Sequence, residues 1–192
     1  MKKLVIACIF CISIATVMAQ DNHKKWQFAV GASVYSPIGK FKDYYNPAYG
    51  GDLEVSYKIS EKFSWYLKTG YSIFSGKKNT YTYYGIPFQY TSPTINYVPI
   101  LSGPSYKIGK FSVGCASGVG IYTFKNVDNA YPVISDTTGV SFTYSPEVAF
   151  DSGKFKIAAS FTSSLVKLDE QVSGFVNLKN ATFIGLNIFY KF

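Results

Sequence analysis

The sequence has few of the residues on which most enzyme and metal chemistry depends. Its single histidine is His23, and Cys115 is the one cysteine outside the first 19 residues. A lone cysteine cannot form a disulfide within its own chain. After residue 20 no apolar run approaches the roughly 20 residues that a transmembrane helix needs. These absences argue against a disulfide scaffold, a histidine-based metal site and a helical membrane protein.

The N-terminal segment has the three parts of a secretory signal peptide. The basic pair Lys2 and Lys3 comes first, a mainly apolar stretch follows, and Val17-Met18-Ala19 has the small-x-small form of a cleavage site. We therefore expect residues 1–19 to be a signal peptide that is removed. Residues 20–192 are then enough for one domain.

The composition of the chain favours strands over helices. It contains 17 Tyr, 16 Phe and 16 Gly but two Met, and aromatic residues are enriched in β-sheets. The formal net charge is +8, or +6 without Lys2 and Lys3. Nucleic acid is a poor explanation for this charge in an exported protein, whereas phosphate-bearing lipid head groups are a better one.

Seven segments show the period-2 alternation of β-strands. In the first, Trp26, Phe28, Val30, Ala32 and Val34 alternate with small or polar residues. In the last, Ile184, Leu186, Ile188, Tyr190 and Phe192 do the same. The seven segments are 26–34, 52–59, 63–73, 111–121, 140–150, 155–165 and 184–192.

Charged residues in these segments keep to one face. None falls on the apolar row, and the opposite row carries Asp52, Glu54, Lys58, Lys68, Glu147, Lys156 and Lys191. A Lys or Arg facing lipid at mid-depth costs about 2 to 4 kcal/mol, so a lipid-facing row requires this segregation. A soluble barrel that holds an apolar ligand would turn the same two rows the other way.

The polar row predicts a filled lumen. We expect Glu54, Lys58, Lys68, Glu147 and Lys156 to neutralise one another there, because unpaired buried charges are costly. A gated ion path through the same charges is the alternative. Glycines on this row leave space that Tyr66, Phe74 and Phe189 would fill.

The connections predict the number of strands. Three short polar turns, at 57–63, 106–111 and 150–155, each end in Lys-Phe, and four longer polar connections separate them. Three hairpins with one strand before and one after make an all-β, antiparallel up-and-down transmembrane β-barrel of about eight strands. Within it, 95–108 is the weakest strand, because Pro99 and Pro104 remove backbone donors and suggest a bulge or kink.

These features resemble the porin-like bacterial outer-membrane β-barrel families, of the small OmpA/OmpX-like kind. The resemblance implies a location in the cell outer membrane and contact with its lipid and lipopolysaccharide. The ending Leu186, Ile188, Tyr190 and Phe192 looks like the signal that the outer-membrane assembly machinery recognises in such barrels. Aromatic residues beside the short turns would form an interfacial girdle.

Function is less clearly indicated. We expect a non-enzymatic protein with a structural or surface-interaction role, without a cofactor or nucleic-acid partner. A narrow porin and a lipid-acting barrel enzyme are the alternatives; the enzyme is disfavoured because His23 precedes the first strand and Asp169-Glu170 is more simply a solvated pair. The loop tyrosines could contact an extracellular partner or belong to an aromatic girdle with lipopolysaccharide contacts. They are Tyr44, Tyr45, Tyr49, Tyr81, Tyr83, Tyr84 and Tyr90, among Lys40, Lys42, Lys77 and Lys78.

Overall fold

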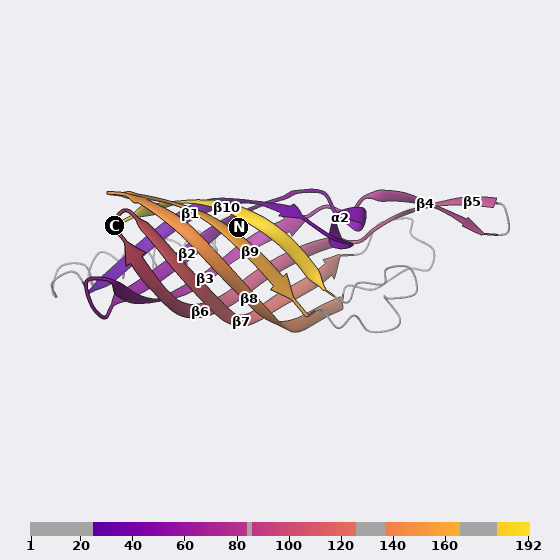
Figure 1. The fold of residues 1–192 in the computed structure, drawn as a ribbon. Coiled ribbons are helices and arrows are strands. Elements are labelled where there is room, and N and C mark those ends of the chain that lie inside the picture. Colours follow the sequence, from indigo (N-terminus) through magenta and orange to yellow (C-terminus); the bar gives the residue numbers. More distant parts are fainter. Residues whose placement is uncertain (1–24, 84–85, 126–136, 166–179) are drawn as a thin grey trace, which may run out of the picture.

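A computed structural model describes residues 25–83, 86–125, 137–165 and 180–192, with the backbone alone at residues 81–83, 86, 88 and 90. The expected signal peptide, His23 and Asp169-Glu170 lie outside the described residues. Eight of the ten strands in these described residues form a closed antiparallel barrel in the order β1-β10-β9-β8-β7-β6-β3-β2 (Figure 1). These strands are β1 (Trp26–Pro37), β2 (Ala48–Lys58), β3 (Phe63–Phe74), β6 (Thr94–Ile108), β7 (Phe111–Lys125), β8 (Thr137–Ser152), β9 (Phe155–Ser164) and β10 (Ala181–Lys191).

The first and last strands close the barrel. Val30 of β1 lies opposite Tyr190 of β10, and the pairing runs from Ala29↔Lys191 to Pro37↔Phe183. The backbone N–H of Phe192 donates to the carbonyl of Phe28 at 2.9 Å. Closure leaves the barrel without an open edge, so its backbone groups can pair inside a membrane. The expected eight-strand barrel is confirmed.

The two rims differ as expected. The three short turns join β2 to β3, β6 to β7 and β8 to β9, and we call this end the turn rim. Gly109 and Gly153 have φ of 62° and 60° there, in the left-handed region that glycine enters without strain. The opposite end, the loop rim, carries the long connections. One of them contains a four-residue helix, α2 (Phe41–Tyr44).

One long connection differs from expectation. Instead of an irregular loop, it contains β4 (Lys78–Tyr83) paired with β5 (Ile86–Thr91) as a separate two-stranded sheet. This ribbon extends beyond the loop rim (Figure 1). The two runs are separated by two residues and are rich in Thr and Tyr, which is a hairpin signal that the strand count overlooked.

The expected strand at 95–108 is confirmed, and of the bulge or kink expected at its prolines the bulge is absent. The register of β6 against β3 and against β7 is the same on both sides of Pro99 and Pro104. The prolines instead leave gaps in the ladder: β3 and β6 lack pairs near Pro99, and β6 and β7 lack pairs near Pro104. Each missing donor is accommodated without an inserted residue.

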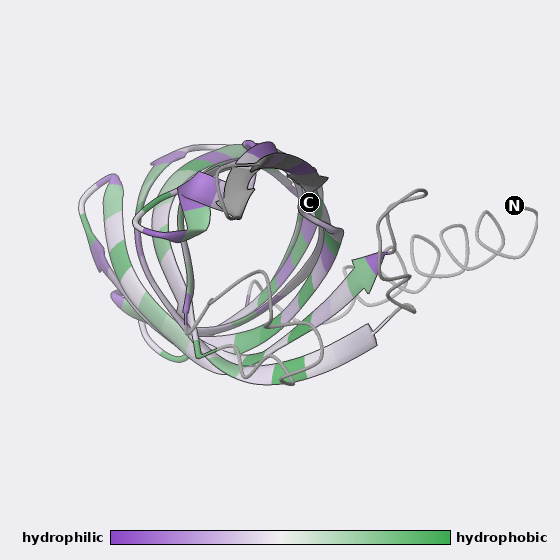
Figure 2. Cartoon of the chain, turned by 90° about the vertical axis from the view of Figure 1, so that its right-hand side faces the viewer, coloured by the Kyte–Doolittle hydropathy of each residue, from purple (hydrophilic) through white to green (hydrophobic). Residues whose placement is uncertain are grey.

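The apolar row faces outward and the polar row faces inward. Val30, Leu67, Ile157 and Leu186 are exposed on the outer wall, whereas Lys68 and Glu147 are buried inside. Banding of apolar and polar residues along the strands follows this alternation (Figure 2). The arrangement is the reverse of that in a soluble ligand-binding barrel and suits a wall in contact with lipid.

Aromatic side chains ring the turn rim on the outside. Trp26 packs against Tyr57 with ring centroids 4.8 Å apart, and Phe111 packs against Phe150 at 5.3 Å. Tyr190 lies between Phe155 and Phe192, at 5.5 and 5.2 Å. The expected girdle beside the short turns is therefore present.

Among the described residues, no helix is long and apolar enough to cross a membrane.

Candidate functional site: the lumen of the barrel

The inward side chains divide the lumen into three zones along the barrel axis. Aromatic residues fill the loop-rim end, a layer of charged residues crosses the middle, and a polar cavity opens at the turn rim. The zones follow from the inward row of each strand. On β2, for example, the row runs from Ala48 at the loop rim through Asp52 and Glu54 to Lys58 at the turn rim.

We call the loop-rim zone the aromatic plug. Its members come from six strands (β1, β2, β3, β6, β7 and β10), from α2 and from the residue that follows α2, and each is 3% exposed or less. Phe183 packs against Tyr35 at 5.2 Å and against Phe74 at 5.2 Å between ring centroids. Such low exposure shows that these side chains pack against one another and fill this end of the lumen. The plug consists of Tyr35, Phe41, Tyr45, Ala48, Phe74, Ile95, Tyr97, Tyr122, Phe124, Ala181 and Phe183.

The plug corrects one expectation about the loop tyrosines. Tyr45 is not part of a contact surface, because it is 1% exposed and packs against Phe41 with ring centroids 4.7 Å apart. Tyr44 packs against the plug as well. Tyr49 is exposed on the outer wall. The structure does not describe the side chains of the other four loop tyrosines, Tyr81, Tyr83, Tyr84 and Tyr90.

The middle zone is a network of ion pairs. Lys156 of β9 lies 2.7 Å from Glu147 of β8 and 2.8 Å from Glu54 of β2. Lys68 of β3 lies 3.3 Å from Glu147. The ring of Phe189 lies 5.3 Å from the Lys68 ammonium and 5.4 Å from that of Lys156, a cation–π geometry. Four of the five expected lumenal charges therefore meet as predicted.

The network has a fifth member that the sequence prediction left out. Asp52 is 1% exposed and accepts hydrogen bonds from Ser33 at 2.5 Å and Tyr35 at 2.9 Å. It lies 4.0 Å from Lys68. The alternation of the sequence already placed Asp52 on the inward row. Its position along the barrel axis, which brings it close to Lys68, depends on the stagger between the strands. Asp52 also links the network to the plug through Tyr35.

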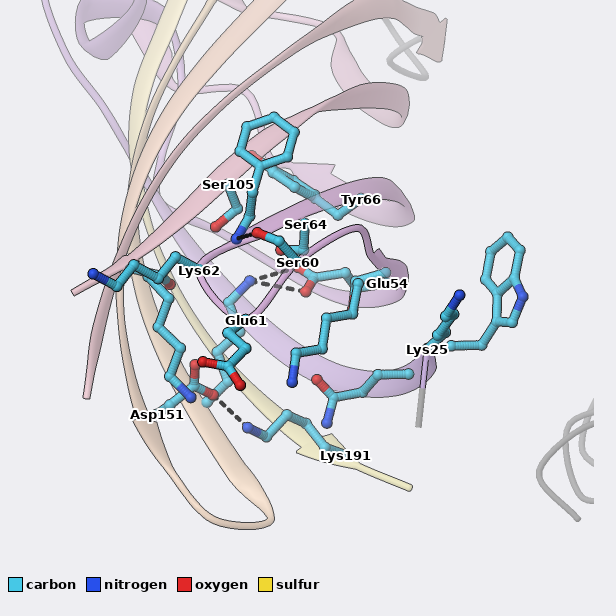
Figure 3. Close-up of a pocket in the computed structure, with 18 of the residues that line it drawn as sticks. Lys25, Glu54, Ser60, Glu61, Lys62, Ser64, Tyr66, Ser105, Asp151 and Lys191 are labelled. Carbon is cyan, nitrogen blue, oxygen red and sulfur yellow. Dashed lines mark hydrogen bonds and ion pairs between the residues drawn. The ribbon is translucent and has the colours of Figure 1, made fainter. Parts of the chain in front are cut away.

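Lys58 does not join the network, and this part of the prediction is wrong. It points inward as expected, but it lies near the end of β2, where it is exposed and lines the cavity at the turn rim. Two further inward groups, Lys191 and Asp151, form an ion pair at the same rim. Figure 3 shows this cavity, which we call the vestibule.

The proposed assembly residues lie on the outer face of the closing strand. Leu186, Ile188, Tyr190 and Phe192 are all exposed, and Phe192 is 71% exposed. Their recognition by an assembly machinery stays a prediction. Among the described residues, no group of His, Cys, Asp and Glu side chains could hold a metal ion.

Comparison with solved structures identifies the architecture. The attachment invasion locus protein Ail of Yersinia pestis, crystallised with the heparin analogue sucrose octasulfate, matches with a TM-score of 0.53 and 14% identity, over 88% of this chain and 98% of that chain. Ail in a phospholipid bilayer nanodisc gives a TM-score of 0.52 and 17% identity, over 88% and 100%. Neisserial surface protein A gives 0.53 and 7%, over 87% and 97%.

The fold is that of the small outer-membrane barrels. At these identities the likeness concerns architecture alone. No family model matches the sequence, and neither does any curated protein.

Proposed function

We propose that this chain is a non-enzymatic protein of the bacterial outer membrane that acts by contact at the loop rim. The observation that carries the proposal is the aromatic plug, whose members are 3% exposed or less and close the lumen at that end. A barrel closed in this way presents its outer loops rather than a passage. A narrow porin is less well supported, because the lumenal charges are paired with one another instead of lining a wet path.

The outer wall supports the membrane location. Outward residues such as Leu53, Phe142 and Ile188 are about half exposed, and such a continuous apolar surface is unfavourable in water. The inward ion pairs Lys68–Glu147 and Lys156–Glu54 would face solvent if the barrel were inverted. Both features fit a barrel surrounded by lipid.

Charge at the loop rim favours an anionic partner. Lys40, Lys42 and Lys78 are exposed there, whereas Asp43 is the single carboxylate in α2. Lys77 of the connection to β4 donates to the carbonyl of Lys42 at 2.6 Å, which ties that connection to the helix. Ail was crystallised with a sulfated sugar, and lysines on a fixed rim suit the same chemistry here. Sulfated or phosphorylated polysaccharide, including lipopolysaccharide, is the proposed partner class.

Binding to immobilised heparin tests this proposal. The protein in zwitterionic lipid nanodiscs should bind at low salt, and the double variant Lys42→Gln/Lys78→Gln should bind about tenfold more weakly. The matched control is Lys110→Gln/Lys154→Gln, which removes the same charge from exposed positions of the turn rim. Equal weakening in both variants would show that heparin responds to the net charge of the protein and not to the loop-rim lysines. An absence of binding in the parent protein would overturn the proposed partner class.

A further inference from the structure

The vestibule at the turn rim is a second place where the chain can bind a ligand. It has a volume of about 400 Å³, within the range typical of small-molecule sites. Lysine, serine and glutamate side chains surround it, from the start of β1, the β2–β3 turn and the ends of β8 and β10 (Figure 3). It lies at the opposite end of the barrel from the loop rim, so this inference goes beyond the proposed function.

The lysines of the vestibule outnumber its carboxylates. Lys156 is already paired with Glu54 and Glu147, and Lys191 with Asp151. Four other lysines line the cavity, and the remaining side-chain carboxylate is Glu61. None of the four has an ion pair within 4.0 Å among the described residues. They are Lys25, Lys58, Lys62 and Lys107.

The strand register arranges hydroxyl donors between these lysines. Lys58 of β2 lies opposite Ser64 of β3, and Ser64 lies opposite Ser105 of β6. On the next strand, Ser112 of β7 lies opposite Lys107 of β6. Two lysines and three serines thus form an arc across four neighbouring strands. Ammonium groups are donors only, and a hydroxyl can donate as well, so the arc suits an oxygen-rich anion.

The floor of the vestibule is closed. Glu54 and Lys156 line its inner end and belong to the ion-pair network, and the aromatic plug lies beyond them. An anion that enters from the turn rim therefore reaches a blind cavity. Walls of low dielectric around a concave positive surface strengthen its field, which favours retention of the anion.

We propose that the vestibule binds a small multivalent oxyanion of the phosphoryl class. Four unpaired lysines against one unpaired side-chain carboxylate suit a ligand with two or three negative charges, and lysine is a common phosphate-binding residue. The phosphoryl group can come from a free phosphate ester in the aqueous space at this rim. It can also come from the head group of an anionic lipid in the adjacent leaflet.

Titration with inorganic pyrophosphate tests the proposal. The protein is placed in nanodiscs of zwitterionic lipid, and calorimetry at low salt should show saturable binding at one site. Lys58→Gln/Lys107→Gln should weaken binding about a hundredfold, because the variant removes two lysines and each charge-assisted hydrogen bond contributes about a factor of ten. The control Lys110→Gln/Lys154→Gln lies at the same rim outside the cavity and should change affinity less than about twofold.

Amide NMR shifts separate the outcomes. Pyrophosphate should perturb Ser64 and Ser105 and leave Lys40 and Lys42 of the loop rim unchanged. If phosphatidylglycerol in the nanodisc perturbs the same serines and competes with pyrophosphate, the source is a lipid head group; without competition it is a soluble phosphate. Absence of saturation, equal losses in the two variants, or shifts confined to the loop rim would each overturn the proposal without affecting the loop-rim function.

Discussion

Lys156 and Glu54 form an ion pair across the lumen between two strands that are not neighbours in the barrel. The Nζ of Lys156 on β9 lies 2.9 and 2.8 Å from the two carboxylate oxygens of Glu54 on β2, although the residues are 102 positions apart in the chain. Two intervening strands, β1 and β10, separate β2 from β9 in the sheet. The pair therefore crosses the lumen and connects the first hairpin to the last.

Removal of this lysine should destabilise the barrel. Lys156→Met leaves Glu54 and Glu147 without their closest cation, and breaking a buried pair costs about 3 to 5 kcal/mol. Urea unfolding of the refolded protein in detergent measures the change. The control is Lys154→Met, at an exposed turn position two residues earlier. It should change the free energy of unfolding by less than about 0.5 kcal/mol. Equal stability of the two variants would show that the network contributes little.

Gly103 should be intolerant of a side chain. A Cβ there would meet the backbone of Cys115 and Ala116 on β7, where backbone atoms cannot move without disturbing the wall. Gly103→Ala should therefore lower the free energy of unfolding by about 1 to 3 kcal/mol. At Gly139, where nothing lies within 4 Å of an added Cβ, the same change should be neutral or slightly stabilising. Similar losses at both positions would contradict this explanation.

The barrel should conduct few ions. Eight strands enclose a space that side chains fill, and the plug and the paired charges occupy it in this chain. Planar-bilayer recordings should show no steady channels at protein amounts at which a 16-stranded porin gives clear steps. Small salt-dependent channels whose selectivity changes in Glu147→Gln would instead support the narrow-porin alternative.

Phe192 should matter for assembly. Its ring is exposed on the turn rim, and its backbone bonds to the first strand. Deletion of Phe192, or replacement with Asp, should lower the amount of protein assembled in the outer membrane far more than His23→Ala does. Phe155→Asp is a matched control, since Phe155 is another exposed aromatic residue of the same rim. Equal losses for Phe155→Asp and Phe192→Asp would point to the girdle rather than to a terminal signal.

Much of this architecture could be predicted from the sequence because successive side chains of a barrel strand point alternately to the lipid and to the lumen. The alternation separated Glu147 from Val148 and Lys156 from Ile157, and the short turns gave the eight strands. It did not give the position of each residue along the barrel axis. That position depends on the stagger between strands, which places Asp52 beside Lys68 and leaves Lys58 at the rim.

The plug was the least predictable part. Phe74 belongs to a regular strand, and its inward position followed from parity. Phe41 and Tyr45 lie in and just after a four-residue helix, and they were placed in a polar connection. A single helical turn has too few residues for a recognisable period. Their burial follows from the tertiary structure, because α2 folds over the open end of the barrel.

The most direct test of the account is the location and form of the protein in the cell. The outward apolar row and closed hydrogen-bonded wall predict recovery in the outer-membrane fraction. The unboiled protein should also migrate differently from the boiled protein in gel electrophoresis, because the closed barrel resists detergent until it is heated. Recovery in the soluble periplasmic fraction, with identical migration before and after boiling, would contradict the central claim.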